Sequence, residues 1–457
     1  MIFWNTTQPI RVAYIVWGFI IFTMVTWVPA IFIPLWGDDY FFLQQAKHAR
    51  LNNLSWMLPF YSESETGFWR PLSMDVPWRI IETYLHGNSI VAHAFSLLLW
   101  FISVIFVYLL ALKISNTLNW NNSKTISLVA AALYSFSAVH YLVLHWVSAI
   151  NSSILVIFIC LPLIFWVSII NGKSSKFILY LLMPFLQILA LFCKESAILL
   201  PALMLCISLF TNKKLNSEQL LTCGVCIITC VIWFYFFNQL THHRDNSYEI
   251  KFGVNIIQNS VALVAWMLNI PREAIRLILI GQVITALVWL TPIVILMITF
   301  LYFVFDGARK FLSKFQLLAI LGFIFFGYAP YFLLSHQSYE YYAAIAIILP
   351  IIGVARSLTI ANRTYIGLLV FAIASFVSIQ GSRMLDYPGL IGRAYWAETQ
   401  LASLQSRQIT TPLVICINNE HQFYAIGIKG LAWRLGIDED QIVLSERCDA
   451  SLGQITF

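Results

Sequence analysis

The amino-acid sequence predicts an α-helical integral membrane protein with about eleven transmembrane helices, a large first outer loop and a small C-terminal outer α/β element. Its 457 residues are 60% hydrophobic and only 11% charged, and the mean hydropathy is +0.79. Soluble domains average about 45–50% apolar and about 25% charged residues, so this chain has too few charges to cover a water-facing surface. The composition excludes soluble enzymes, nucleic-acid-binding proteins and disordered scaffolds, and no nucleic-acid partner is expected.

Eleven segments are apolar enough to cross about 30 Å of hydrocarbon, which takes about 20 helical residues. They are residues 11–35, 90–112, 125–144, 152–171, 177–193, 197–211, 219–240, 280–305, 315–335, 341–355 and 364–380. A further apolar stretch, residues 254–270, contains Asn255, Gln258, Asn259 and Asn269. Because such polar side chains make crossing costly, we expect this stretch to be an interfacial or re-entrant helix.

The distribution of lysine and arginine predicts the orientation of the chain. If the N-terminus is cytoplasmic, twelve of the 27 basic residues fall in short inner loops, where such residues are enriched. They are Arg11, Lys113, Lys124, Lys173, Lys176, Lys213, Lys214, Arg309, Lys310, Lys314, Arg356 and Arg363. The sequence therefore predicts a cytoplasmic N-terminus and a C-terminus outside.

The chain divides into a membrane part and a tail. Residues 1–380 are expected to form the polytopic transmembrane domain, with long outer loops at residues 36–89 and 241–279. Residues 381–457 follow the last predicted helix and lie on the outer side. This tail is short for an independent catalytic domain.

The tail has the pattern of a small α/β element. A strand at Leu413–Ile417, a helix at Gln422–Leu435 and a strand at Gln441–Leu444 are separated by polar turns. Cys416 and Cys448 fall in this tail and could form a disulfide in an oxidising compartment. Whether they pair is left open.

Asp38 and Asp39 are adjacent carboxylates placed directly after the first predicted helix, in the sequence Trp-Gly-Asp-Asp-Tyr. Carboxylates at a membrane boundary are costly unless they are solvated, paired or metal-bound. Neighbouring residues do not share a helical face, so the two are expected to serve different partners. One would be a general base, and the other a structural acceptor or a ligand of a divalent cation such as magnesium or manganese. Alternatively, both are solvated acids at a helix cap.

Two cationic side chains complete the charged candidates on the outer side. Lys194 and Glu195 fall between two apolar segments, and a charged pair at that depth is by default a functional hypothesis. The alternative is a snorkelling lysine beside an exposed glutamate. Arg70 precedes Pro71 on an extended backbone, so it could reach a phosphate or pair with acids of its own loop.

Histidines form the last group of candidates. His140, His145 and Trp146 fall in a predicted outer turn, and His93 lies in the second predicted helix. The two turn histidines are five residues apart, which does not suit a metal pair on one helical face. Packing or hydrogen bonding is the simpler role for each histidine taken singly.

Taken together, these motifs resemble the GT-C glycosyltransferases, and among them the bacterial relatives of the protein O-mannosyltransferases and of the tetratricopeptide-bearing mannosyltransferases. The matching motifs begin at Asp38 (Asp-Asp), Arg70 (Arg-Pro-Leu), Trp146 (Trp-Val-Ser-Ala) and Lys194 (Lys-Glu-Ser-Ala-Ile). The resemblance covers roughly residues 1–350.

The resemblance implies a glycosyltransferase of the bacterial inner membrane that moves a sugar from a polyprenyl-phosphate donor to a glycan, lipid or protein on the outer face. It implies that Asp38 or Asp39 is the base, with Asp38 preferred, and that Lys194 with Arg70 lies near the donor phosphate. The side chains expected to support the site or the acceptor are Glu195, His93, His140, His145 and Trp146.

The sequence departs from the family pattern at three places. His140 is followed by tyrosine, without the proline and the downstream acid that relatives carry. Ser96 stands where an asparagine is common, and Tyr341 precedes Tyr342 where relatives have Arg-Tyr. A second catalytic carboxylate is therefore unassigned.

Two other function classes remain as alternatives. A transporter of lipid-linked sugars would also place polar groups between helices, but such proteins usually contain internal repeats, and none is evident. A glycan polymerase or ligase of another polytopic class would place its arginine-rich loop late in the chain, whereas here the first loop is the elaborate one.

Overall fold

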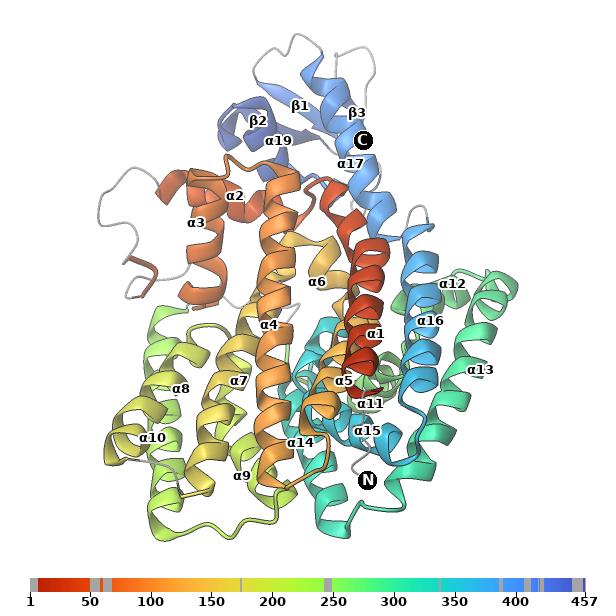
Figure 1. The fold of residues 1–457 in the computed structure, drawn as a ribbon. Coiled ribbons are helices and arrows are strands. Elements are labelled where there is room, and N and C mark those ends of the chain that lie inside the picture. The colour runs from red at the N-terminus through yellow and green to blue at the C-terminus, as the bar shows by residue number, and fades with distance from the viewer. Residues whose placement is uncertain are drawn as a thin grey trace.

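The computed structural model describes residues 7–49, 58–60, 68–172, 175–241, 249–336, 338–385, 389–406, 412–417, 419, 423–445 and 455–456. The chain folds into a helical bundle that carries a small α/β element at one end (Figure 1). The α-helices are α1 (Thr7–Phe22), α2 (Asp38–Ala49), α3 (Val76–Thr83), α4 (Ser89–Thr117), α5 (Ser123–Phe136), α6 (Tyr141–His145), α7 (Asn151–Ile170), α8 (Met183–Leu191), α9 (Leu200–Phe210), α10 (Ser217–Leu240), α11 (Val254–Met267), α12 (Arg272–Leu279), α13 (Val283–Ala308), α14 (Lys314–Phe332), α15 (Ile348–Ile360), α16 (Thr364–Arg383), α17 (Leu390–Gln405) and α19 (Gly427–Leu435). Short helical segments that connect them include η1 (Thr23–Trp27), η2 (Val28–Phe32), η5 (Ala138–His140), η6 (Val147–Ile150), η8 (Glu195–Leu199) and η10 (Glu340–Ala344).

The described residues contain seven helices that are long and apolar enough to cross a membrane. They are Val12–Phe32, Ser89–Thr117, Val147–Ile170, Ser217–Leu240, Val283–Ala308, Lys314–Phe332 and Thr364–Arg383. The pair Ser123–Phe136 and Ala138–His145, bent by 50°, makes an eighth if it counts as one span. The chain is thus a helical membrane protein, but the predicted number of eleven spans is not confirmed.

Three predicted membrane spans form apolar helices that are too short to cross a membrane: Ile178–Leu191, Glu195–Phe210 and Ile348–Ile360. The first two are separated at Lys194, whose backbone is extended (φ −167°, ψ 146°). The third begins only after the η10 segment. Apolar composition predicted these helices, but the interruptions at their ends shorten them.

Residues 254–270, for which we predicted an interfacial or re-entrant helix, stabilise the bend between α5 and α6. Ser137 is extended (ψ 133°), so the next N–H, that of Ala138, leaves the helical pattern. That N–H donates to Oδ1 of Asn269 at 2.9 Å, and Asn269 is fully buried. Backbone groups freed inside a membrane protein need such partners. Helix α11 has 14 residues, fewer than a span needs; its interfacial or re-entrant position stays a prediction.

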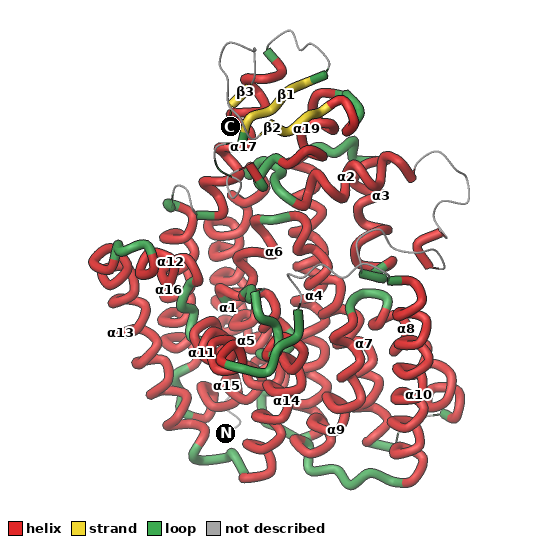
Figure 2. The backbone as a smooth tube through the Cα atoms, turned by 180° about the vertical axis from the view of Figure 1, so that it is seen from behind, coloured by secondary structure: helices red, strands yellow, loops and turns green. Residues whose placement is uncertain are grey.

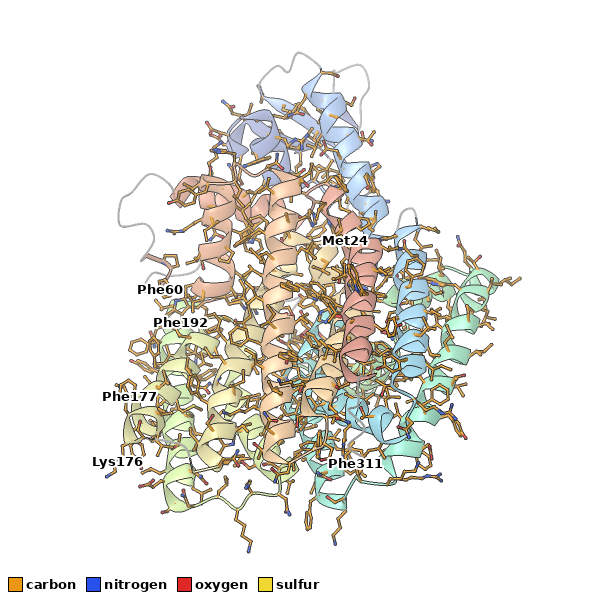
Figure 3. All side chains as sticks on the ribbon, in the orientation of Figure 1. Met24, Phe60, Lys176, Phe177, Phe192 and Phe311 are labelled. Atoms are coloured by element: carbon orange, nitrogen blue, oxygen red, sulfur yellow. The ribbon has the colours of Figure 1, made fainter. Side chains whose placement is uncertain are left out.

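The two ends of the bundle differ in what they carry. The turns that join α4 to α5, α9 to α10 and α13 to α14 lie at the end where α1 begins, and Figure 3 shows Lys176 and Phe311 there as well. Helices α2 and α3 and the C-terminal element lie at the opposite end (Figures 1 and 2). This arrangement agrees with the predicted alternation of inner and outer loops. Which end faces the cytoplasm stays a prediction.

The C-terminal element is a parallel sheet of β1 (Leu413–Cys416), β2 (Ile442–Ser445) and β3 (Ile455–Thr456) in the order β2-β1-β3, accompanied by α17 and α19. The two predicted strands lie at β1 and β2, whereas α17 and β3 were not predicted. Cys416 is disulfide-bonded. Cys448 lies outside the described residues, so the predicted Cys416–Cys448 pair is not tested.

The C-terminal element packs on the first outer loop through aromatic contacts. The rings of Trp433 and Tyr40 are 6.0 Å apart, and Lys429 lies 3.9 Å over the ring of Phe41. Gly87 has φ +60°, and a Cβ there would be 2.3 Å from the Trp433 ring. The close approach of Trp433 therefore requires glycine at position 87.

Candidate functional site

Asp39 is a fully buried carboxylate that ties the first outer loop to the turn after α6. Its Oδ1 accepts hydrogen bonds from the N–H (2.7 Å) and the hydroxyl (2.6 Å) of Ser148, and its Oδ2 accepts from the N–H of Trp36 (3.1 Å). Trp36 also stacks on Trp146 at 5.2 Å. Burial raises the pKa of Asp39 to about 7, although the hydrogen bonds from Ser148 and Trp36 favour the charged form. These contacts are those of a structural acceptor.

Asp38 has more open surroundings, because its side chain is only half-buried. The hydroxyl of Tyr424, in the C-terminal element, donates to Oδ1 of Asp38. The neighbouring Gly37 (φ +57°) donates its N–H to the carbonyl of Ala425 at 2.8 Å, which fixes this junction. Asp38 is the first residue of α2, where the helix N-terminus favours a negative charge. Asp38 is thus placed as a half-buried carboxylate at a helix N-terminus.

Asp39 is engaged by protein donors, and the divalent cation predicted at Asp38 and Asp39 stays a prediction. Both oxygens of Asp39 accept hydrogen bonds. In the described part of the chain, no group of three or more His, Cys, Asp or Glu side chains is arranged to hold a metal. The two aspartates have different partners, as expected of neighbours on a helix.

Lys194 is 5% exposed and lies at the break between α8 and η8. Its Nζ faces three tyrosine rings, at 4.5 Å from Tyr342, 5.1 Å from Tyr341 and 5.2 Å from Tyr331. The rings of Tyr331 and Tyr342 stack at 4.0 Å. Tyrosine faces attract a cation, but among the described residues no carboxylate lies within 4.0 Å of this amine. Burial lowers the pKa of Lys194, and Arg70 adds to this lowering while Glu195 opposes it. An anionic group of a ligand in the cage would therefore stabilise the charged ammonium.

Arg70 and Glu195 form a two-point ion pair across the edge of the same site. Nε and Nη2 of Arg70 donate to the two carboxylate oxygens at 2.9 and 2.7 Å. The remaining Nη1 lies 3.8 Å from Sδ of Met74. The pair with Glu195 engages the guanidinium of Arg70, and contact between Arg70 and the donor phosphate stays a prediction. Glu63 and Glu65 of the same loop lie outside the described residues, so pairing of Arg70 within its own loop is not tested.

The Arg70–Glu195 pair is one of several links between the first outer loop and the break at Lys194. Ser73 donates its hydroxyl to the carbonyl of Cys193. The rings of Phe60 and Phe192 lie 5.4 Å apart, and Figure 3 shows them next to each other at the top of α8. These links fix the position of the outer loop relative to Lys194.

The structure adds a buried charged cluster that the sequence analysis did not select. Arg272 lies 4.0 Å from the carboxylates of both Glu273 and Glu340, and 4.8 Å over the ring of Tyr339. Glu273 and Glu340 are 1% and 4% exposed. Nη2 of Arg272 and Oε2 of Glu340 have no hydrogen-bond partner, which is rare for buried polar groups. The charges of Arg272 and Glu273 were visible in the second outer loop, but their approach to Glu340 depends on tertiary packing.

Tyr339 lies between the loop of Asp38, the Lys194 cage and the Arg272 cluster. Its ring lies 6.3 Å from Trp146, 5.6 Å from Tyr341 and 5.7 Å from Tyr342. Burial raises the pKa of Tyr339; Arg272 opposes this rise and the carboxylate of Asp38 adds to it. Trp146, which stacks on Trp36, connects Tyr339 to the loop that carries Asp38. The short segment 339–342 thus contributes Tyr341 and Tyr342 to the Lys194 cage and places Tyr339 against Arg272.

The three candidate histidines are almost fully buried and hold the backbone around the bend after α5. Each ring donates one N–H to a carbonyl: His93 to Leu144 (3.2 Å), His140 to Tyr134 (2.9 Å) and His145 to Tyr141 (2.6 Å). Nε2 of His145 also accepts a hydrogen bond from Nε of Arg383 at 2.8 Å, so this imidazole is neutral. Trp146 stacks on Trp36. These four side chains support the 134–148 segment that delivers Ser148 to Asp39.

Comparisons with known proteins give little direct guidance. No protein-family model matches the chain, and no curated protein matches it. Among solved structures, the chain is similar to the crystal structure of an oligosaccharyltransferase from Archaeoglobus fulgidus in complex with zinc and sulfate, at 11% identity and a TM-score of 0.48. The alignment covers 93% of this chain and 61% of that one, so the chain spans less than two thirds of that enzyme's length. At these values, a function has to be argued from the residues of this chain.

Proposed function

We propose that this protein is a membrane glycosyltransferase that moves a sugar from a polyprenyl-phosphate donor to a hydroxyl group of a glycan, lipid or protein on the outer face of a bacterial inner membrane. One observation carries the proposal: Tyr339 is linked through Trp146 and Trp36 to the loop of the half-buried carboxylate Asp38, and the nearby Tyr341 and Tyr342 cage the amine of Lys194. Such a pair of groups is what sugar transfer from a phosphate leaving group requires.

The acceptor is activated at Asp38. The carboxylate accepts the proton of the acceptor hydroxyl as its oxygen attacks C1 of the sugar, which is general-base catalysis. Tyr424 donates to Oδ1 of Asp38 and thereby orients the carboxylate. Asp39 holds the loop in place through Ser148 and Trp36.

The leaving group is stabilised at Lys194. As the bond between C1 and the phosphate oxygen breaks, negative charge grows on the polyprenyl phosphate, and a preorganised cation lowers the energy of that state. Lys194 lies at the end of α8, so the phosphate would be held there while the polyprenyl chain stays in the lipid. Arg70 acts on this step indirectly, because its ion pair with Glu195 fixes the chain next to Lys194.

The Arg272 cluster is the best candidate for binding the polar groups of the transferred sugar. Arg272, Glu273 and Glu340 offer buried donors and acceptors without protein partners, next to Tyr339. Sugar hydroxyls both donate and accept hydrogen bonds, so they suit a cluster of mixed charge. The proposed mechanism does not invoke a metal.

The test is to incubate the purified protein with a set of polyprenyl-phosphate sugars and with glycolipid and protein acceptors from the outer envelope. Mass spectrometry then reads the products. The proposal predicts an acceptor heavier by one sugar residue, together with free polyprenyl phosphate in equal amount. If lipid-linked sugar is instead carried across proteoliposomes without any covalent change, the protein is a transporter and the proposal is wrong.

A further inference from the structure

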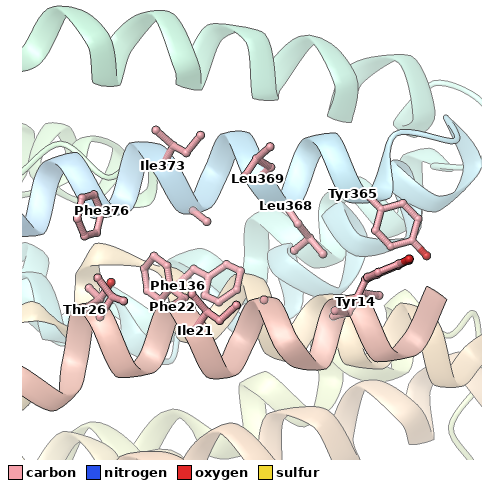
Figure 4. Close-up of a pocket in the computed structure, with 14 residues that line it drawn as sticks. Tyr14, Ile21, Phe22, Thr26, Phe136, Tyr365, Leu368, Leu369, Ile373 and Phe376 are labelled. Atoms are coloured by element: carbon pink, nitrogen blue, oxygen red, sulfur yellow. The ribbon is translucent and has the colours of Figure 1, made fainter. Parts of the chain in front are cut away.

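A groove with apolar walls lies between α1 and α16 (Figure 4). Both helices belong to segments that are long enough to span a membrane. Its volume is about 400 Å³, within the range of ligand sites. Its walls include Tyr14, Gly18 and Phe22 from α1, and Leu369, Ile373 and Phe376 from α16. The spacing of these residues puts each set on one face of its helix. Their faces form the opposing walls that Figure 4 shows.

The groove and the Arg272 cluster lie on different faces of α16: Leu369, Ile373 and Phe376 line the groove, whereas Ser378, Ile379 and Ser382 line a small pocket with Arg272, Glu273 and Glu340. Figure 1 shows α1 and α16 in front, whereas the view from behind in Figure 2 has α11 and α14 in front. Helix α14 carries Tyr331, which is part of the Lys194 cage. A lipid in the groove is therefore a different molecule from a donor whose phosphate is bound at Lys194.

Gly18 keeps one wall of the groove open. A Cβ added at Gly18 would meet no atom within 4 Å. By contrast, a Cβ at Gly307 would come within 1.9 Å of the carbonyl oxygen of Ser357, so that glycine is needed for helix packing. Glycine inside a helix costs about 1 kcal/mol relative to alanine. Because glycine at position 18 adds no side chain to this wall, the groove has room for an occupant.

A cationic side chain lies beyond the outer end of the groove. Arg383 follows Phe376 by two helical turns on the same face of α16. It donates from Nη2 to the carbonyl of Thr26, a groove residue, and from Nε to His145. These contacts use two of its five N–H groups, and the side chain is partly exposed. A guanidinium in this position suits a phosphate group.

We infer that this groove binds one acyl chain of an anionic membrane phospholipid, with the lipid phosphate at Arg383. The apolar walls match a hydrocarbon chain, and the arginine at the outer end matches the charge of the headgroup. Arg383 joins α16 to α1 through Thr26 and to α6 through His145, so the bound lipid stabilises this junction. The inference does not depend on the proposed sugar transfer.

The test compares Gly18→Leu, which fills the groove, with Gly224→Leu in α10. A Cβ at Gly224 also meets no atom within 4 Å, and Gly224 is not part of the groove. Phosphatidylglycerol is titrated into delipidated protein in detergent, with phosphatidylcholine as the uncharged control, and binding is followed by native mass spectrometry and by the melting temperature.

Wild type and Gly224→Leu are expected to bind phosphatidylglycerol with equal affinity and to melt at higher temperature in its presence. Gly18→Leu is expected to bind it at least about tenfold more weakly, which corresponds to about 1.4 kcal/mol. Arg383→Gln should lose the preference for the anionic lipid, and Arg383→Lys should retain it. Equal binding by Gly18→Leu and Gly224→Leu would overturn the inference. Displacement of phosphatidylglycerol by equimolar polyprenyl phosphate would also overturn it, since the groove would then belong to the donor.

Discussion

Two adjacent aspartates show how surroundings separate residues of the same type. Asp39 is fully buried with three hydrogen bonds, whereas Asp38 is half-buried and faces Tyr424. The sequence identified the pair, because two carboxylates next to a membrane-spanning helix are energetically costly unless they are solvated, paired or bound to a ligand. It could not assign their roles, since Ser148 and Tyr424 reach them only through tertiary packing. The same reason explains why the Arg272 cluster escaped notice: Glu340 approaches Arg272 and Glu273 only through tertiary packing.

The buried carboxyl of Asp39 predicts a pH-dependent stability. Its pKa rises from 3.8 to about 7 on folding, so between these values the folded state binds more protons than the unfolded state. Stability from this group is therefore lost as the pH rises from about 4 to about 7. Asp39→Asn removes that loss, so its melting temperature should fall less across this range than that of wild type. Asp306→Asn, at an exposed ion pair, is the control and should follow wild type. Parallel curves for Asp39→Asn and wild type would contradict the assignment.

The Lys194 cage predicts a defect in donor use. Lys194→Ala removes a charge-assisted contact worth about 1.5–3 kcal/mol, or about tenfold to a hundredfold in apparent donor affinity. Lys194→Arg should recover part of the loss, because it keeps the charge but changes the geometry. Steady-state kinetics with varied donor measures this, and Lys310→Ala, in a surface ion pair, serves as control. Unchanged donor dependence in Lys194→Ala would return the residue to a structural role.

At the scale of elements, apolar composition located the long apolar helices of the bundle, but not α2, α3 and α12 in the predicted outer loops and not where the helices break. The breaks at Ser137 and Lys194 depend on distant groups such as Asn269, which supplies a partner for the freed N–H of Ala138. Local sequence carries no signal for such a contact. Three predicted spans are short for this reason, and two of them begin or end beside the candidate site.

The bend after α5 predicts a measurable role for Asn269. Asn269→Ala leaves the buried N–H of Ala138 without a partner, at a cost of about 1–3 kcal/mol. We expect a clear drop in melting temperature in detergent. Gln258→Ala, at an exposed position of α11, should melt like wild type. If both variants melt alike, Asn269 does not support the bend.

At the scale of the whole molecule, the segregation of the basic inner loops from the C-terminal element predicts opposite accessibility for the two ends. In intact cells, Asp438→Cys should react with a membrane-impermeant maleimide. Lys310→Cys should react only after the membrane is permeabilised. The six free cysteines in the described part of the chain are buried, so background labelling from them should be low. Labelling of position 310 in intact cells would reverse the orientation.

The most direct test of the central claim is the transfer rate of Asp38→Asn with a polyprenyl-phosphate donor. Asparagine keeps the size of the side chain and accepts the hydrogen bond of Tyr424, but it cannot take up the acceptor proton. General-base catalysis contributes about 10²–10⁴-fold, so the rate should fall by that factor. Donor binding and melting temperature should stay close to wild type. An Asp38→Asn protein that turns over at the wild-type rate would contradict the assignment of Asp38 as the catalytic base.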